Sequence, residues 1–192
     1  MRRSLTWARI LLLVLAVSAC TPTPLVTDGL DAVTGVTVTQ STEPFILYRD
    51  ESFRRGDDRD LVYIGPLQVN RMGDYKTFLW LGILSLERYG EMKMNTEDFA
   101  DIEILADNTV LNLEVTGWTP AAIGMSEQVY KQVPEWAESA YYEVSVEQLH
   151  TLALANEIRL RTTAEIAPSY EPWSNQTQAL SALREFVVFN DY

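Results

Sequence analysis

The sequence predicts an α+β fold in which two helices of the carboxyl-terminal region pack on an antiparallel sheet of about seven or eight strands. Three observations lead to this fold class. Strand patterns fill residues 45–115, helical patterns appear only in the last third of the chain, and no βαβ alternation connects the two kinds. Strands first and helices last are typical of helices packed on an antiparallel sheet.

The first strands are indicated by β-branched and aromatic residues between turn signals. Residues 45–49, 61–69 and 75–86 have this composition, and the acidic run at residues 57–60 separates the first two. Gly73 suits a turn position with positive φ before the third strand. Residues 75–86 are apolar at both odd and even positions, which predicts a central strand covered on both faces.

A hairpin and two further strands follow. Residues 102–106 and 110–115 flank Asp107-Asn108, and Asp and Asn tolerate the left-handed conformation of a tight turn. Residues 140–144 and 158–166 alternate between apolar and polar side chains, so each is expected to bury one face.

Two helices are expected near the end of the chain. Ser145-Val146-Glu147-Gln148 is a capping box, in which Ser and Gln satisfy backbone donors at a helix start. After a break at residues 168–172, the apolar residues from Ala179 to Val187 recur at helical spacing.

The first 19 residues have the pattern of a secretory signal. Arg2, Arg3 and Arg9 precede an apolar run over residues 10–17, and small residues follow the run. The run is too short to span a bilayer, which needs about 20 residues. We expect residues 1–19 to be removed; the alternative is that they form a buried first helix.

Val17-Ser18-Ala19-Cys20 resembles the lipobox of bacterial lipoproteins. The resemblance implies diacylglycerol on the Cys20 sulfur, cleavage before Cys20, and acylation of the new amino terminus with a fatty acid such as palmitate. Several acyl chains anchor a protein stably, whereas one is marginal. Lipoproteins with Asp after the cysteine stay in the inner membrane; Thr21 at that position implies the outer membrane, with the domain facing the periplasm. The only other resemblance, of residues 64–73 and 79–83 to uncharacterised proteobacterial envelope lipoproteins, implies no activity.

The sequence divides into three parts. Residues 1–19 are the signal, residues 20–44 are expected to be the lipidated cysteine and a flexible tether, and residues 45–192 a single periplasmic domain. Residues 36–39 could instead form a first edge strand, which would shorten the tether. Cys20 is the only cysteine, so no internal disulfide is expected.

The charge of the chain excludes some partners. Removing residues 1–19 leaves 12 basic and 27 acidic residues, a net charge of −15. Such a chain is not expected to bind nucleic acid, or anionic lipid through charge. No second apolar run reaches membrane length, so the partners expected are the bilayer, through Cys20, and an envelope protein.

No motif predicts catalysis, a cofactor or a metal. His150 is the only histidine, no Gly-x-Ser-x-Gly motif is present, and His150 is expected to be a half-buried structural residue. No dinucleotide, P-loop or zinc spacing occurs. Asp57, Asp58 and Asp60 lack the glycine and distal Glu of an EF-hand loop and suit a solvated turn.

Two clusters remain as candidate sites. Trp118, Trp136 and Trp173 lie in predicted loops, where they form either a binding surface or covers for the ends of the sheet.

The sequence therefore favours a non-catalytic binding or assembly module of the cell envelope. One alternative is an envelope hydrolase with paired carboxylates, from the acidic residues Glu97, Asp98, Asp101 and Glu103. Another is a small-ligand carrier, which needs an enclosed apolar cavity.

Overall fold

The computed structural model describes residues 24–50, 59–85, 95–131, 133–134, 137–163, 169–174 and 176–190. Within them lie ten strands, and every pairing between them is antiparallel. The α+β fold class is confirmed. The strands are β1 (Val26–Leu30), β2 (Thr37–Ser41), β3 (Phe45–Asp50), β4 (Arg59–Arg71), β5 (Asp74–Ser85), β6 (Asp101–Ala106), β7 (Thr109–Glu114), β8 (Glu138–Glu143), β9 (Ile158–Thr162) and β10 (Ser169–Pro172). The helices are α2 (Val146–Leu154) and α3 (Thr177–Asn190), with short 3₁₀ helices η1 (Thr96–Phe99) and η2 (Pro120–Ile123).

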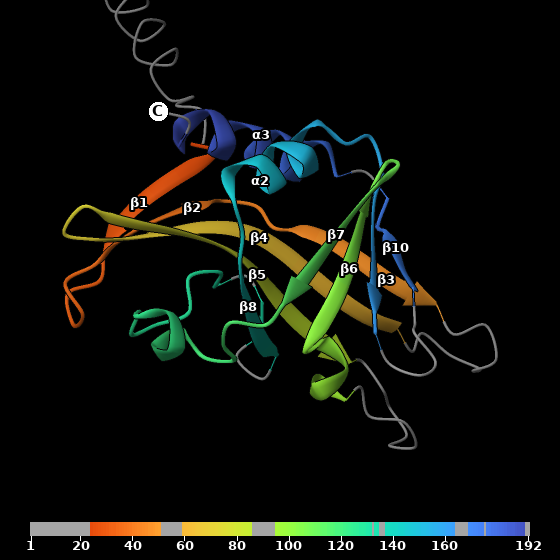
Figure 1. Ribbon diagram of the computed structural model, residues 1–192, viewed down its shortest axis with the longest axis horizontal. Helices are drawn as coiled ribbons and strands as arrows, with labels where there is room; N and C mark the ends of the chain where they lie inside the picture. Colours follow the sequence, from red (N-terminus) through yellow and green to blue (C-terminus); the bar gives the residue numbers. More distant parts are fainter. Residues whose placement is uncertain are drawn as a thin grey trace, which may run out of the picture.

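The sheet is built around β4, which is long enough to pair with three strands. One edge of β4 pairs with β3 and then with β2, while β5 pairs along nearly the whole of the other edge. The sheet continues from β2 to β1, from β3 through β10, β9 and β6 to β7, and from β5 to β8. It curls into a half-barrel, with α2 and α3 over one side (Figure 1).

The residues after β7 join it to β8. The Thr116 N–H donates to the Tyr141 carbonyl at 2.7 Å, and the Tyr141 N–H donates to the Gly117 carbonyl at 2.8 Å. These bonds hold the two ends of the curled sheet together.

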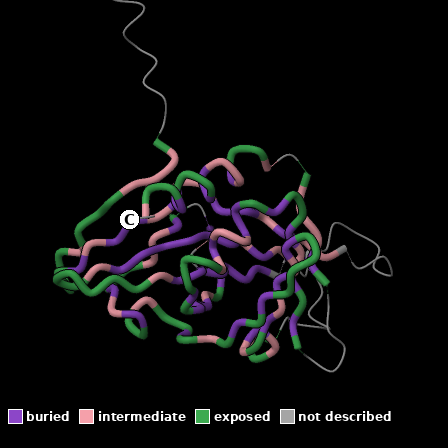
Figure 2. The backbone as a smooth tube through the Cα atoms, turned by 45° about the horizontal axis from the view of Figure 1, so that its top comes forward, coloured by how far each residue is buried: buried purple, intermediate pink, exposed green. Residues whose placement is uncertain are grey.

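Buried residues run along the central strands (Figure 2). Their side chains alternate between the two faces of the sheet and form two clusters. On one face, apolar side chains of β4 and β5 pack with α2, α3 and the strands β6, β7 and β9. On the opposite face they pack with the segment that follows β7. That second cluster contains Leu67, Val69, Phe78, Trp80, Ile123, Met125, Tyr130 and Val133. The predicted central strand at residues 75–86 is confirmed as β5, and both of its faces are covered over residues 78–84.

The predicted local signals form as expected. The Ser145 Oγ accepts from the Gln148 N–H at 3.2 Å, and the Gln148 Oε1 accepts from the Ser145 N–H at 2.8 Å. Asp107, at the β6–β7 turn, has φ of 51°, and Gly73, at the β4–β5 turn, has φ of 94°. Each of these turns and caps is therefore specified by its own residues.

The tether predicted over residues 20–44 is wrong for residues 26–41, which form β1 and β2. Here β2 is an inner strand between β1 and β4, and Val36 is 0% exposed. The Asp31 carboxylate accepts from the Val33 and Thr34 N–H groups and Gly35 has φ of 72°, which makes a hairpin turn. The predicted break at residues 168–172 also contains a short strand, β10, which is held by pairing with β3 and β9.

Among the described residues, no helix has the length and apolar character needed to cross a membrane. Cys20 and the rest of residues 1–23 lie outside the described part of the chain.

Candidate functional site

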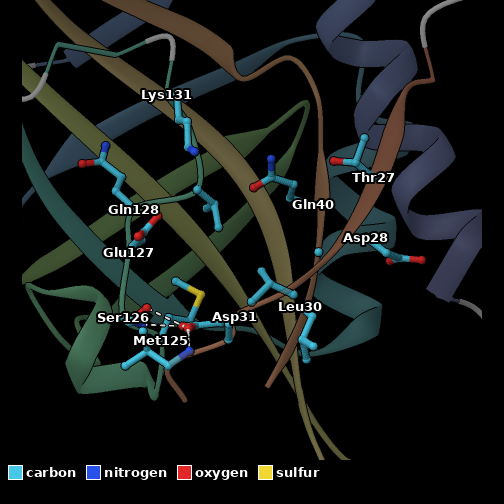
Figure 3. Close-up of a pocket in the computed structure, with 15 residues that line it drawn as sticks. Thr27, Asp28, Leu30, Asp31, Gln40, Met125, Ser126, Glu127, Gln128 and Lys131 are labelled. Carbon is cyan, nitrogen blue, oxygen red and sulfur yellow. Dashed lines mark hydrogen bonds between the residues drawn. The ribbon is translucent and has the colours of Figure 1, made fainter. Parts of the chain in front are cut away.

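A groove of about 390 Å³ lies between the β1–β2 hairpin and residues 125–131 (Figure 3). We call it the hairpin groove. It is lined by residues 27–33, Val38, Gln40, residues 125–129 and Lys131. Its size falls within the range of about 300–1,000 Å³ that is usual for ligand sites.

One end of the 125–131 segment is attached to the hairpin through Asp31. The Asp31 carboxylate accepts from the Ser126 N–H at 2.6 Å and from the Ser126 hydroxyl at 2.7 Å, and Figure 3 shows both bonds. These bonds, together with those from the Asp31 turn, hold the pKa of the Asp31 carboxyl well below its ordinary range. Asp31 therefore keeps a negative charge in the groove and also fixes the position of its opposite wall.

The other end of the segment is attached through Tyr130. Its ring stacks on Trp80, with centroids 4.6 Å apart, and its hydroxyl donates to the Pro66 carbonyl at 2.8 Å. The same hydroxyl lies 2.9 Å from the Ser41 Oγ. A Cβ at Gly65 would lie 2.2 Å from the Tyr130 ring, so the absence of a side chain there makes this approach possible. Residues 127–129 thus span the groove between two fixed points.

Asp31→Asn is expected to make stability less dependent on acid. Because the Asp31 pKa is lower in the folded than in the unfolded chain, its contribution to stability is complete above the unfolded pKa of about 3.9. That contribution is lost as the pH falls from this value toward the folded pKa. Thermal unfolding of wild type and variant from about pH 7 to about pH 3 measures the difference, and the wild-type Tm should fall more steeply below about pH 4.

Glu127→Gln is the matched control, because Glu127 is an exposed carboxylate on the opposite wall of the same groove. An equal flattening of the pH dependence in Glu127→Gln would contradict the assignment to Asp31.

The polar lining of the groove has an excess of acceptors and acids. Asp28, Asp31 and Glu127 line it together with a single cation, Lys131. Two buried lining atoms, the Gln40 Oε1 and the Gln128 Nε2, have no hydrogen-bond partner among the described residues. Figure 3 shows the Gln40 carbonyl directed toward the 125–131 segment. Both atoms are buried, so they are unpaired polar groups within the groove wall rather than groups open to a ligand.

The lining residues of the hairpin groove include no histidine that could act with the Ser126 hydroxyl. The hydroxyl beside Asp31 belongs to Ser126, and a carboxyl with a lowered pKa is a weak general base. His150, the only histidine of the chain, is half-buried on α2 and is not among the lining residues.

No family model, curated protein or solved structure matches this chain. The interpretation of the site therefore depends on its geometry and on the sequence.

The structure separates the tryptophans predicted as one binding surface. Trp118, 36% exposed, lines an open hollow of about 610 Å³ below the sheet. The Trp173 ring packs edge-on against Tyr48, with ring centroids 5.3 Å apart. The backbone N–H of Trp173 donates to the Ile46 carbonyl, so Trp173 covers the end of β3. Trp136 lies outside the described residues. Among the tryptophans that the structure describes, Trp118 is the one that lines such a hollow.

The acidic cluster is also divided. Glu97 lines the Trp118 hollow together with Glu138, which is not a member of the predicted acidic cluster. Glu103 instead pairs with Arg161 at 2.5 Å and lines a different hollow, beside Val110 and Ser169. Of the other acids, Asp98 and Asp101 line neither hollow.

The acidic turn at residues 57–60 is described only in part. Asp60 is buried and forms an ion pair with Arg49 across the β3–β4 pair, while Asp57 and Asp58 lie outside the described residues. In the described ranges, no three His, Cys, Asp or Glu side chains gather as they would around a metal ion.

The enclosed space found in the main core is small. It measures about 10 Å³ and is lined by Phe45, Ile64, Leu79, Ile104, Leu152 and other side chains. That is about the volume one water molecule needs. Among the described residues, the larger hollows are open grooves at the surface rather than a chamber for an apolar ligand.

The hairpin groove was missed from the sequence because its parts are far apart in the chain. Asp31 and Ser126 are separated by 95 residues, and Ser41 and Tyr130 by 89. One signal was available: Asp31 followed by Gly35 marks a turn between two Val- and Thr-rich stretches. The sequence contains no comparable signal for residues 125–131.

Proposed function

We propose that this chain is a lipoprotein of the bacterial outer membrane whose periplasmic domain is a non-catalytic binding module for an envelope protein. The lipobox-like segment ending at Cys20 supports the anchor, and the acidic composition is consistent with a protein partner rather than nucleic acid. The binding role is assigned to the hairpin groove, because its volume of about 390 Å³ lies within the range usual for ligand sites.

The position of β1 in the sequence limits how far the domain can lie from a lipid on Cys20. Val26, the first residue of β1, is six residues after Cys20. Six extended residues reach about 20 Å, so a domain anchored through Cys20 stays close to the bilayer surface. The partner is then expected in or beside the membrane rather than across the periplasm.

Cys20→Ser is expected to abolish membrane attachment, because it removes the sulfur that accepts the lipid. In cells fed a radiolabelled fatty acid, wild type should carry the label and the variant should accumulate as an unlabelled, uncleaved precursor. Ser18→Ala is the matched control, since it keeps a small residue in the same segment and should be processed normally. Labelling and cleavage of Cys20→Ser would exclude the lipoprotein assignment.

Photo-crosslinking in living cells tests the binding role of the groove. A photoreactive residue in place of Gln128, on the groove wall, should give a crosslink to one envelope protein. The same residue in place of Glu185, exposed on α3, should not. Crosslinks from position 185 with none from position 128 would place the binding surface elsewhere.

A second candidate function is supported by the Trp118 hollow. Glu97 and Glu138 line it beside an exposed aromatic ring, and two carboxylates flanking a bond are the usual catalysts of glycoside hydrolysis. Incubation of the protein with purified cell-wall glycan tests this. Release of reducing ends that is lost in both Glu97→Gln and Glu138→Gln would support a hydrolase, and no release by wild type would remove it.

A further inference from the structure

β1 is an edge strand of the sheet, and its residues 27–30 are among those that line the hairpin groove. Within the described residues β1 pairs only with β2. Its first two residues are half-buried and its last three are exposed, and Leu30 is 71% exposed. The free part of the edge is therefore residues 28–30.

The register shows which backbone groups of this edge are available. The Thr42 N–H donates to the Leu25 carbonyl before β1, and the Asp31 N–H donates to the Val36 carbonyl after it. Because hydrogen-bonded positions alternate in an antiparallel pair, the odd-numbered residues of β1 face β2. The N–H and C=O groups of Asp28 and Leu30 therefore point outward, unpaired with β2.

The groove gives a second chain room to approach that edge. All residues from 27 to 33 line it, including those whose side chains lie on the other face of β1. The Asp28 side chain, for example, accepts from the Thr39 hydroxyl at 2.6 Å on that other face. A Cβ at Gly29 would meet nothing within 4 Å, so the middle of the edge is not obstructed.

The chemistry of the groove selects an extended polypeptide. A strand added to an exposed edge forms main-chain hydrogen bonds, and its alternate side chains enter neighbouring pockets.

The charge of the groove selects the kind of polypeptide. The Asp31 and Glu127 carboxylates line it beside Lys131, and the whole chain has a net charge of −12. A Lys- or Arg-bearing strand complements this lining, whereas a second copy of the same acidic chain would place Asp28 and Asp31 near their like-charged counterparts.

We propose that the hairpin groove binds an extended, basic segment of a partner protein, which pairs with the outer edge of β1 as an additional strand. This inference rests on the proposed binding role of the same groove. It adds the direction of the contact, through the Asp28 and Leu30 backbone, and the charge of the partner.

Panning of a random peptide library on the purified full-length chain in detergent tests the proposal. The selected peptides should be rich in Lys and Arg and should bind more weakly as salt is added. Leu30→Pro removes one outward N–H while keeping the β1–β2 hydrogen bonds, and is expected to weaken their binding about tenfold. Leu30→Thr, which keeps the N–H at this exposed position, should bind like wild type.

A second measurement leaves the protein unchanged. A selected peptide is synthesised again with a methyl group on every second backbone nitrogen. The methylated peptide cannot donate the hydrogen bonds of strand pairing, so it should also bind about tenfold more weakly. Selection of no peptide, selection of acidic peptides, or equal binding by Leu30→Pro and by the methylated peptide would overturn the proposal. Self-association of the chain that Leu30→Pro abolishes would also overturn it, in favour of a second copy.

The failure of this proposal can be distinguished from failure of the proposed function. Crosslinking from position 128 without any strand-forming peptide would leave the binding role intact and remove only the added strand. Normal maturation of Cys20→Ser would remove the anchor but would not affect the peptide result.

Discussion

Trp80→Ala is expected to lower the free energy of unfolding by about 3–5 kcal/mol, the usual loss for truncating a buried large aromatic side chain. Trp80 is 0% exposed and lies between the sheet and the 125–131 segment, where its ring stacks on Tyr130. Its indole N–H also donates to the Ser139 Oγ at 3.1 Å. Truncation removes the surface on which that segment rests. Urea unfolding followed by tryptophan fluorescence or far-ultraviolet circular dichroism measures the change.

Trp118→Ala is the matched control for this prediction. Trp118 is partly exposed and its ring lines an open hollow, so its removal should cost much less stability. Equal losses in the two variants would contradict the packing described for the second face of the sheet.

Gly65→Ala is expected to lower the free energy of unfolding by about 1–3 kcal/mol, although it adds only one methyl group. The new Cβ would lie 2.2 Å from the Tyr130 ring, which is buried and held by Trp80 and by the Pro66 carbonyl. The ring must move, and the 125–131 segment must move with it. Unfolding measures the loss, and faster hydrogen exchange at residues 126–131 would locate it.

Gly29→Ala is the control in the opposite direction. Gly29 also lies in a strand, but its Cβ would meet nothing within 4 Å. The substitution should be neutral or slightly stabilising, because it restricts the unfolded chain. An equal loss of unfolding free energy in Gly29→Ala and Gly65→Ala would contradict the assignment of the Gly65→Ala loss to the contact with Tyr130.

Both variants also affect the hairpin groove. The wall formed by residues 127–129 is held by Tyr130 at one end and by Ser126 at the other. We therefore expect Trp80→Ala and Gly65→Ala to weaken ligand binding in the groove as well as the fold.

Elements governed by near neighbours in the chain could be predicted from the sequence. The capping box at Ser145 starts α2, and Asp107 takes the left-handed conformation between β6 and β7. The apolar residues of the last helix, such as Leu183 and Phe186, are buried as their spacing indicates. In each case the interacting groups are a few residues apart, so the sequence pattern contains the whole interaction.

β1 was not predicted, and β2 was predicted only as an alternative, as an edge strand at residues 36–39, whereas it is an inner strand. Both are five residues long, and their Thr, Gly and Pro-flanked composition is also typical of a linker. What makes β2 a strand is its pairing with residues 67–70 of β4 and the burial of Val36 and Val38 in the second core cluster. Short strands are stabilised by the sheet that they join rather than by their own sequence.

The order of strand and helix patterns along the chain was enough to predict the α+β class, and most of the turns could be predicted because each depends on residues that are close in the sequence. The lipid attachment at Cys20 stays a prediction. The groove depends on contacts over long separations: Asp31 with Ser126, Tyr130 with Ser41, and β2 with β4. Such contacts need the curled sheet. They hold the β1–β2 hairpin, which was predicted as a tether, against residues 125–131, which contain no recognisable motif. The candidate binding site therefore emerged from the tertiary structure, since no single segment of the chain contains enough of it to be recognised.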